Sequence, residues 1–386
     1  MPAEETEKKS KNKIKVFAKK IDGYNSEKIE EFLKEVAEQT SLREKLTKSE
    51  KIVIKPNLLG AYSPEKAVTT HPVVIEAMIR ILLSWNKKVY IADSPGGTVD
   101  VEKVWKITGM KDISEKYPVE LVKLNGPVVE KKYKGYTLYI DKFIDESDCI
   151  INMCKYKTHS LMLYTGAVKN LFGVVPGLKK SQYHKEYPDP QIFGSMLSAL
   201  YNTIKEKVVI NIMDGILGME GEGPSGGIPR KFGILLASEN APALDCKAAE
   251  FMGFRLAALP YLSKSMNSDN LSQDSIQIDT SFRDFKFNNV KIRGVKSIGK
   301  LIGIIPDFLI NLFKKWFDIR PVFLNKCKLC GICVKSCPVS ALTLGKGDSK
   351  PKVDYSKCVR CMCCHEFCPH QAIIVHKSLL AKLILK

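Results

Sequence analysis

The sequence lacks the long apolar run that a membrane-spanning helix requires. No stretch reaches about 18 apolar residues, and the longest candidate, 302–313, is interrupted by Pro306 and Asp307. The N-terminus reads MPAEETEKKSKNK and has no apolar core of a secretory signal peptide. Residues 1–13 are therefore expected to form a disordered polar tail, and the protein is expected to be cytoplasmic, with no transmembrane segment.

Short fingerprints of nucleotide and nucleic-acid binding are also absent. The glycine-rich stretch 218–227 has neither the spacing of a dinucleotide-binding loop nor that of a P-loop. No helix-turn-helix, zinc-finger or RNA-binding signature accompanies the formal net charge of +18. Directly nicotinamide-dependent and ATP-driven reactions are therefore disfavoured, and nucleic acid is the least favoured partner. The lysines are spread along the chain, which is typical of a solvated surface.

The sequence contains 12 cysteines, but their distribution argues against a disulfide framework. Nine of them lie between Cys327 and Cys368, at the spacing of metal ligands. Ligation by thiolates requires reduced sulfur, which fits a reducing cytosol. The remaining three, Cys149, Cys154 and Cys246, lie in apolar segments and are expected in the hydrophobic core.

Two runs of cysteines repeat the same spacing, Cys-x2-Cys-x2-Cys-x3-Cys-Pro. The first consists of Cys327, Cys330, Cys333 and Cys337, and the second of Cys358, Cys361, Cys364 and Cys368. The spacing is that of bacterial ferredoxins and indicates a duplicated half-domain. Zinc prefers two separated cysteine pairs, so a pair of zinc sites is disfavoured. The ninth cysteine, Cys363, is interpreted as a bystander thiol, with an exchange of ligands with Cys364 as the alternative.

This repeat resembles the two-cluster ferredoxins of the bacterial type, and the resemblance implies two 4Fe–4S clusters. By that resemblance, the first cluster takes Cys327, Cys330, Cys333 and Cys368, and the second takes Cys358, Cys361, Cys364 and Cys337. Such a domain is expected to transfer electrons. The neighbouring Lys326, Lys328, Lys335 and Lys357 favour an acidic electron carrier of the ferredoxin or flavodoxin type, or another redox partner protein.

Residues 14–294 alternate between strand-like and helix-like segments. Strands are predicted over 51–58, 88–93, 148–153, 208–213 and 232–237, and helices over 71–85, 192–204 and 243–252, the first of these with Thr70 as its N-cap. The alternation predicts an α/β fold with a mostly parallel sheet and helices on both faces. A basic amphipathic linker, 295–320, is predicted to pack a small α+β ferredoxin-like domain, 321–386, onto this body, with docking to a partner or a membrane surface as the alternative.

Polar residues follow several of the predicted strands. Ligands of open α/β sheets bind at the carboxyl ends of the strands, so the sequence predicts a shared pocket there. The candidate catalytic residues are Lys157, His159 and Asp214. The candidate substrate- or cofactor-binding residues are Lys55, Asn57, Lys155, Lys169, Asn170, His184 and Glu220. A phosphate, a carboxylate or an anionic cofactor suits the cationic members, and a flavin is one option. The structural alternative for Asp214 and Gly215 is a simple turn.

Several motifs over about residues 50–255 resemble the family catalogued as domain of unknown function 362. They are KPNLLG, AVTTHP, DSPGG, KYKTHSLMLYTGAVKNLFGVVPG, MDGILGMEGEGPSGG and ALDCKAAEFMG. The resemblance implies an α/β domain whose polar loops form a shared pocket. We therefore expect an iron–sulfur oxidoreductase that passes electrons between the two clusters and an anionic substrate or cofactor. The alternative is a non-enzymatic ferredoxin-type carrier or adaptor that docks a redox partner complex.

Overall fold

The computed structural model describes residues 13–177, 179–279, 286–291 and 318–378. The predicted polar tail, up to residue 12, and the predicted amphipathic linker, up to residue 317, lie outside the described residues. None of the helices within the described ranges has the length and apolar character needed to cross a membrane.

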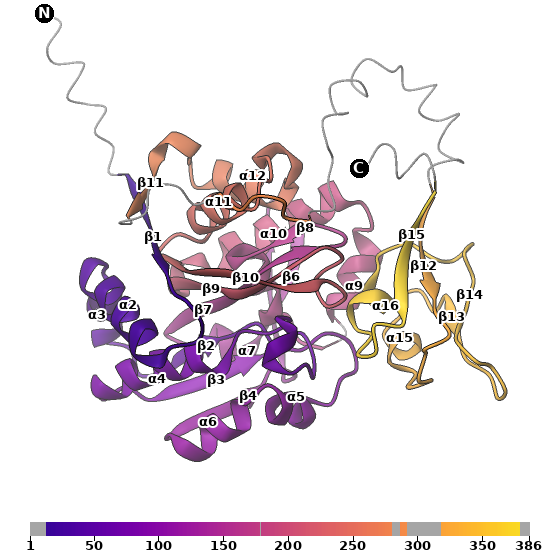
Figure 1. Cartoon of the computed structure of the whole chain (residues 1–386), viewed down its shortest axis with the longest axis horizontal. Coiled ribbons are helices and arrows are strands. Elements are labelled where there is room, and N and C mark those ends of the chain that lie inside the picture. Colours follow the sequence, from indigo (N-terminus) through magenta and orange to yellow (C-terminus); the bar gives the residue numbers. More distant parts are fainter. Residues whose placement is uncertain (1–12, 178, 280–285, 292–317, 379–386) are drawn as a thin grey trace, which may run out of the picture.

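A mixed sheet forms the centre of the larger domain (Figure 1). Its nine strands comprise, in spatial order, β11 (Ile276–Asp279), β1 (Ile14–Lys20), β10 (Ile228–Ser238), β9 (Val208–Glu220), β7 (Cys149–His159), β2 (Ile52–Lys55), β3 (Val89–Asp93) and β4 (Val119–Lys123), with β8 (Leu163–Thr165) paired to β7. The neighbours β9, β7, β2, β3 and β4 are parallel, whereas β10 is antiparallel to both β9 and β1. The predicted mostly parallel α/β fold is confirmed.

Helices cover both faces of this sheet. One face carries α2 (Ser26–Gln39), α3 (Leu42–Thr47), α4 (Pro72–Ser84), α5 (Val101–Ile107) and α6 (Met110–Lys116). The other face carries α7 (Lys142–Asp145), α8 (Ala167–Asn170), α9 (Lys179–Glu186), α10 (Pro190–Ile204), α11 (Ala241–Phe251), α12 (Pro260–Ser268) and the hairpin of β5 (Val128–Tyr133) and β6 (Tyr136–Asp141). Because side chains alternate along a strand, Ile52 and Ile54 of β2 enter one core and Val53 enters the other. Cys149, Cys154 and Cys246 are buried, as expected.

The helix predicted over 71–85 forms as α4, but its N-cap differs from the prediction. His71 is the cap, and its Nδ1 accepts a hydrogen bond from the Val73 amide at 3.3 Å. Thr70 is not the cap, because its hydroxyl accepts from the Asn57 amide at 2.9 Å and donates to the Met153 carbonyl at 2.8 Å. Thr70 thus ties the segment before the helix to strands β2 and β7.

Strands β7 and β9 run further than their apolar segments predict. Lys155, Lys157 and His159 lie inside β7 rather than after it. Asp214 lies inside β9 and is paired with Leu235 of β10, so the interpretation of a simple turn at Asp214 is wrong. The candidate residues on these strands are therefore held by a sheet and not by loops.

The order of the strands reverses next to β2. Strands β3 and β4 follow β2 outward on one side, whereas β7 and β9 lie on its other side. In open α/β sheets, the crevice at the carboxyl ends of the diverging strands is the usual ligand site. Lys55, the last residue of β2, is paired with Asn152 of β7, and it marks this crevice.

Residues 318–378 of the smaller domain form two short sheets and two short helices. Strands β12 (Ile319–Phe323) and β15 (Ile373–Lys377) pair with each other, as do β13 (Leu342–Thr343) and β14 (Lys352–Val353). Helices α15 (Ile332–Lys335) and α16 (Cys363–Glu366) follow equivalent cysteines of the two repeats. In Figure 1 this domain, in gold, lies beside the larger one, with α16 turned toward it.

Candidate functional site

A cavity of about 510 Å³, open mouth included, lies at the carboxyl ends of β2 and β3. The larger domain contributes Lys55, Asn57, Leu59, Asp93, Ser94, Gly96, Lys169, Asn170, Phe172, Gly173, Lys180 and His184 to its wall, and the smaller domain contributes Glu366 and Phe367. The cavity is thus formed between the two domains, at the crevice that the strand order indicates.

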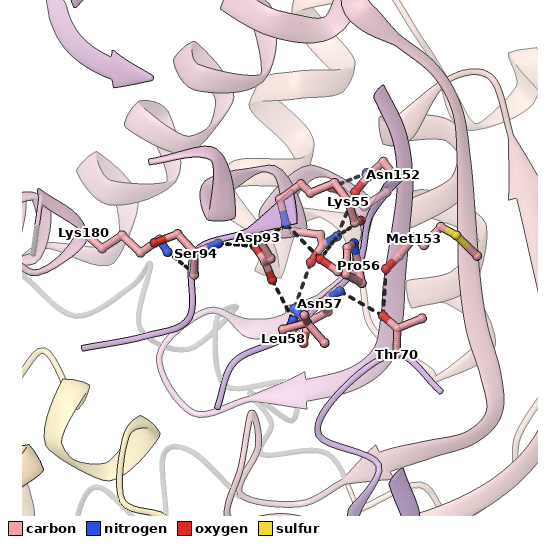
Figure 2. A network of polar contacts seen from close by, with 12 residues as sticks. Lys55, Pro56, Asn57, Leu58, Thr70, Asp93, Ser94, Asn152, Met153 and Lys180 are labelled. Atoms are coloured by element: carbon pink, nitrogen blue, oxygen red, sulfur yellow. Dashed lines mark hydrogen bonds and ion pairs between the residues drawn. The ribbon is translucent and has the colours of Figure 1, made fainter. Parts of the chain in front are cut away.

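A buried ion pair joins the ends of β2 and β3 in the wall of the cavity (Figure 2). The Lys55 ammonium lies 2.9 Å from Asp93 Oδ1 and also donates to the Pro56 carbonyl at 3.0 Å. The second carboxylate oxygen, Oδ2, accepts from the Leu58 amide at 2.7 Å. A side chain at Gly173 would overlap this pair, which explains the glycine there. The two charges cancel, so Lys55 does not add a free positive charge to the cavity.

A chain of side-chain amides crosses the sheet beneath the cavity. Asn57 donates to Asn170 at 2.9 Å, Asn170 to Asn152 at 2.8 Å, and Asn152 to Asn211 at 2.8 Å. Lys157 sets this direction, because its ammonium donates to Asn57 Oδ1 at 2.8 Å and leaves the Asn57 amide nitrogen to donate onward. Each amide orientation is therefore fixed by the one before it.

Lys157 reaches the cavity only through Asn57. Its buried ammonium also donates to the Val68 carbonyl at 2.6 Å. Burial, together with the nearby charges of Lys169 and Lys155, lowers the pKa of Lys157 to about 7. Lys157, which the sequence predicts to be catalytic, is thus separated from the cavity by the Asn57 side chain.

Two lysines leave positive charge unbalanced in the wall. The Lys180 ammonium donates to the Ser94 carbonyl, and Figure 2 shows this side chain reaching toward the loop after β3. Within the part of the chain that the structure describes, the Lys169 ammonium makes no hydrogen bond or ion pair. Burial lowers the pKa of both lysines, that of Lys180 to about 7. An anion bound here would supply the negatively charged partner that neither ammonium group has.

His184 presents an uncharged ring to the cavity. It stacks on Phe193 with ring centroids 4.3 Å apart and an interplanar angle of 20°. Burial and the neighbouring Lys169 lower the pKa of His184 to about 3, so the ring is neutral at physiological pH. His184 therefore acts as an aromatic surface rather than as the cation that the sequence predicts.

His159 faces the smaller domain. Its Nδ1 accepts from the amides of Leu161 at 3.1 Å and Met162 at 3.3 Å, which places the proton of the neutral ring on Nε2. Nε2 lies 3.2 Å from Glu366 Oε1, although the angle is poor for a hydrogen bond. Burial holds the pKa of His159 well below its ordinary value and raises that of Glu366. His159 thus contacts Glu366 but is not itself part of the cavity wall.

Besides Lys157 and His159, three more predicted site residues, Lys155, Asp214 and Glu220, lie outside the cavity wall. The Lys155 ammonium is 2.7 Å from Asp214 Oδ2, and both side chains are fully buried. Tyr24 donates its hydroxyl to Asp214 Oδ1 at 3.0 Å. Glu220 is paired with Arg230 at 2.8 Å. The carboxylates of Asp214 and Glu220 already have ion-pair or hydrogen-bond partners, and the structure does not bring them together with Lys169 and His184.

The two glycine-rich motifs contact the smaller domain. In 218–227, the Ser225 hydroxyl donates to the Glu366 carbonyl at 2.8 Å. In DSPGG, a side chain at Gly96 would overlap the Phe367 ring, and one at Gly97 would lie 2.5 Å from Ser336 Oγ. These glycines let the backbone approach the second domain closely, which explains why they match no nucleotide fingerprint.

The prediction missed Glu366 and Phe367, although the repeat contains a signal for them. At the equivalent positions of the first repeat stand Lys335, which is exposed, and Ser336. The repeats share their cysteines and final proline, and the charge reversal and the change from serine to phenylalanine at these two positions indicate that the two halves meet different surroundings. Lys180 was also missed, although it lies on the same polar helix as the predicted His184.

We expect Gly96→Ala to weaken the contact between the domains. The new methyl group would overlap the Phe367 ring, and overpacking of this kind costs about 1–3 kcal/mol. The free energy of unfolding in urea and hydrogen exchange over 363–368 measure the effect. Gly126→Ala is the control, because its methyl group would lie 3.8 Å from the nearest atom. Equal stability and exchange in the two variants would contradict the expectation.

The cysteines are arranged as ligands of iron–sulfur clusters. Cys327, Cys330, Cys333 and Cys368 line one cavity of the smaller domain. Backbone amides donate to the fourth cysteine of each run: Ala341 to Cys337 Sγ and Ala372 to Cys368 Sγ, each at 3.3 Å. Such donors stabilise thiolate sulfur, so the residues present fit the group.

The two repeats also share their backbone conformation. Positive φ angles recur at three equivalent pairs of positions: Leu329 (52°) and Arg360 (57°), Gly331 (72°) and Met362 (62°), and Ser340 (51°) and Gln371 (49°). Only one of these six residues is glycine, and the left-handed region is unfavourable for the others. The shared conformation is therefore a property of the cysteine loop itself, which wraps the chain around a common centre.

Comparison with known proteins agrees with this architecture. Residues 52–250 match the family described as domain of unknown function (DUF362), and 326–372 match the 4Fe–4S dicluster domain. A thylakoid-associated protein of Synechocystis sp. is 31% identical over 223 residues, which cover 55% of this chain and 66% of that protein, just under two thirds of its length. The lactate racemase apoprotein of Thermoanaerobacterium thermosaccharolyticum gives a TM-score of 0.40 at 15% identity, covering 62% of this chain and 57% of that one. A likeness this weak adds nothing about function.

The dicluster match identifies the smaller domain as an iron–sulfur unit for electron transfer. The larger match takes in more than half of the chain, including every strand from β2 to β10. The chain belongs to the DUF362 family, and in this protein the family domain is joined to a 4Fe–4S dicluster domain.

Proposed function

We propose that this protein is an oxidoreductase in which electrons pass between two 4Fe–4S clusters and an anionic substrate or cofactor in the cavity. One observation carries the proposal. Glu366 and Phe367, which close the cavity, lie in the chain between Cys364 and Cys368. A molecule in the cavity would therefore contact the same turn that supplies thiolates to both clusters.

In the proposed ligand sets, the fourth cysteine of each run binds the cluster held by the other run. Cys327, Cys330, Cys333 and Cys368 hold the first cluster, and Cys358, Cys361, Cys364 and Cys337 hold the second. The shared cavity of the first set supports this assignment. Cys363 is buried in an apolar group with Phe367 and is not assigned as a ligand. When bound, the clusters supply one-electron redox chemistry.

Lys169 and Lys180 bind the anion in this proposal, and the other wall residues shape its seat. Asn57 and Asn170 are held in one orientation by the amide chain. Lys157 and His159 are positioning residues, because they act through Asn57 and Glu366. Lys155, Asp214 and Glu220 stabilise the fold. A flavin is the alternative occupant, with its phosphate on the same lysines.

The exposed face of the smaller domain suits the second end of the electron path. Cys330 is exposed and flanked by the exposed Lys326 and Lys328, whereas Cys361 packs with Leu59 of the larger domain. A basic surface around an exposed ligand favours an acidic electron carrier of the ferredoxin or flavodoxin type. The same face supports the second candidate function, a carrier or adaptor that docks a redox partner complex. The cytoplasmic location stays a prediction.

Native mass spectrometry after anaerobic purification tests the proposed function. Two clusters require about eight irons and eight sulfides per chain, counted on the same sample. We expect additional bound mass in the wild type and its loss in Lys169→Glu, which replaces the unpaired cation by an anion. If the clusters account for all of the mass in the wild type, the carrier or adaptor function is favoured instead.

The affinity of the cavity for anions should depend on pH near neutrality. The pKa of Lys180 is lowered to about 7, with Asp93, Lys55 and Lys169 as the charged groups that face it. An anion binds the protonated ammonium, so binding should be strongest below pH 7 and weaken about tenfold per pH unit above it. Calorimetric titration with acetate measures the slope. Lys180→Met should flatten it, and a wild-type affinity that is constant from pH 6 to pH 9 would contradict the expectation.

A further inference from the structure

The charged groups and hydrogen-bond donors of the cavity restrict the chemical class of ligand that it can bind. This inference rests on the proposed function. Lys55 and Asp93 cancel, and the amide nitrogens of Asn57 and Asn170 already donate within the wall. Among the described residues, the ammonium groups of Lys169 and Lys180 are the charged donors left for a ligand. Two donors match the two oxygens of a carboxylate, whereas a phosphate brings three oxygens and up to two charges.

The remaining walls are flat and apolar. Phe172 and Phe367 line the cavity together with the neutral ring of His184 and the side chain of Leu59. Aromatic walls pack best against planar groups, by stacked or edge-to-face contacts. Phe367 also packs with Cys361 and Cys363, so a planar group against it would lie next to the second cysteine run.

The electron chemistry points to the same class. An iron–sulfur cluster exchanges single electrons, so its redox partner must hold an unpaired electron, at least briefly. A conjugated planar body can delocalise such an electron, and a saturated body cannot. The flat walls and the one-electron chemistry thus favour the same kind of molecule, although they are independent observations.

We propose that the cavity binds a small, planar, conjugated monocarboxylate. Its carboxylate is held by Lys169 and Lys180, and its planar body lies between Phe172 and Phe367. The geometry assigns no particular substituents to this molecule, so benzoate serves as the simplest probe of the class.

Calorimetric titration of the anaerobically purified, eight-iron protein tests this class of ligand. We expect benzoate to bind, and we expect cyclohexanecarboxylate, with the same charge and a puckered ring, to bind at least about tenfold more weakly. Phenyl phosphate should also bind more weakly than benzoate. Lys169→Gln and Lys180→Gln should each lower the affinity for benzoate about tenfold or more. Lys185→Gln is the matched control, because Lys185 lies exposed on the same helix as Lys180.

The outcomes separate the ligand class from the proposed function. If phenyl phosphate binds more tightly than benzoate, or cyclohexanecarboxylate binds as tightly as benzoate, the cavity does not select planar monocarboxylates. The anion site on Lys169 and Lys180 would still stand. If all three probes fail to bind the eight-iron protein, the class is also overturned. If benzoate binds as expected but shifts neither the reduction potential nor the paramagnetic resonance spectrum of a cluster, the class stands and the electron link to the cavity fails.

Discussion

Replacing Cys368 with serine is expected to remove the cluster held by the first cysteine run, although Cys368 belongs to the second. Iron should fall from about eight to about four per chain, because a cubane that loses one of its four thiolates is no longer retained. The reason is geometric, since Cys368 lines one cavity together with Cys327, Cys330 and Cys333. Iron and sulfide analysis under anaerobic conditions measures the loss.

The paramagnetic resonance spectrum of the remaining cluster shows which one was lost. Cys368→Ser should leave the same spectrum as Cys330→Ser, and Cys337→Ser the same spectrum as Cys361→Ser. Cys363→Ser is the control and should keep all the iron, because neither proposed ligand set includes Cys363. A Cys368→Ser spectrum that matches that of Cys361→Ser would show that each run holds its own cluster.

Asp214→Ala is expected to lower the free energy of unfolding by about 3–5 kcal/mol, the usual cost of leaving one member of a buried ion pair without its partner. The Lys155 ammonium lies 2.7 Å from Asp214, and both side chains are fully buried. The Tyr24 hydroxyl and the His71 amide would lose an acceptor as well. Urea unfolding followed by circular dichroism measures the change.

Two controls separate a structural role of Asp214 from a catalytic one. Glu120→Ala removes a partner of Lys88 at the surface, where both side chains are more than half exposed, and should leave the stability nearly unchanged. The affinity of folded Asp214→Ala for benzoate should equal that of the wild type, because Asp214 is not part of the cavity wall. Wild-type stability combined with lost turnover would restore the catalytic prediction.

Local patterns predicted the fold well where apolar residues run without interruption. The segments of β2 and β3 are of this kind, and each forms within a few residues of its predicted bounds, as does α4, whose apolar residues recur at helical spacing. The predicted lengths of β7 and β9 are too short, because Lys155, Lys157 and Asp214 break the apolar pattern of these strands. Lys155 and Asp214 pair across the two strands, and Lys157 is bound by Asn57 and Val68, which lie outside any strand. No local pattern contains the position of these distant partners.

The candidate site was predictable as far as it depends on strand ends. Lys55, Asn57, Lys169, Asn170 and His184 were predicted to share a pocket, and they lie in one cavity wall. Lys155, Asp214 and Glu220 were grouped with them, but each is paired elsewhere. Glu366 and Phe367 complete the wall from a domain some 300 residues further along the chain than Lys55. Their role depends on how the two domains pack, which sequence spacing does not encode.

The divergence of the two cysteine repeats gives the smaller domain an inner and an outer side. The second repeat places Glu366 and Phe367 in the cavity wall, whereas the first has Lys335, which is exposed, and Ser336, whose hydroxyl accepts from the Thr98 amide. In the proposed function, one end of the domain therefore faces the cavity and the other faces the surface, so the two pseudo-symmetric halves are not interchangeable. Changes of external partner can accumulate on the half around Cys330 without disturbing the half that closes the cavity.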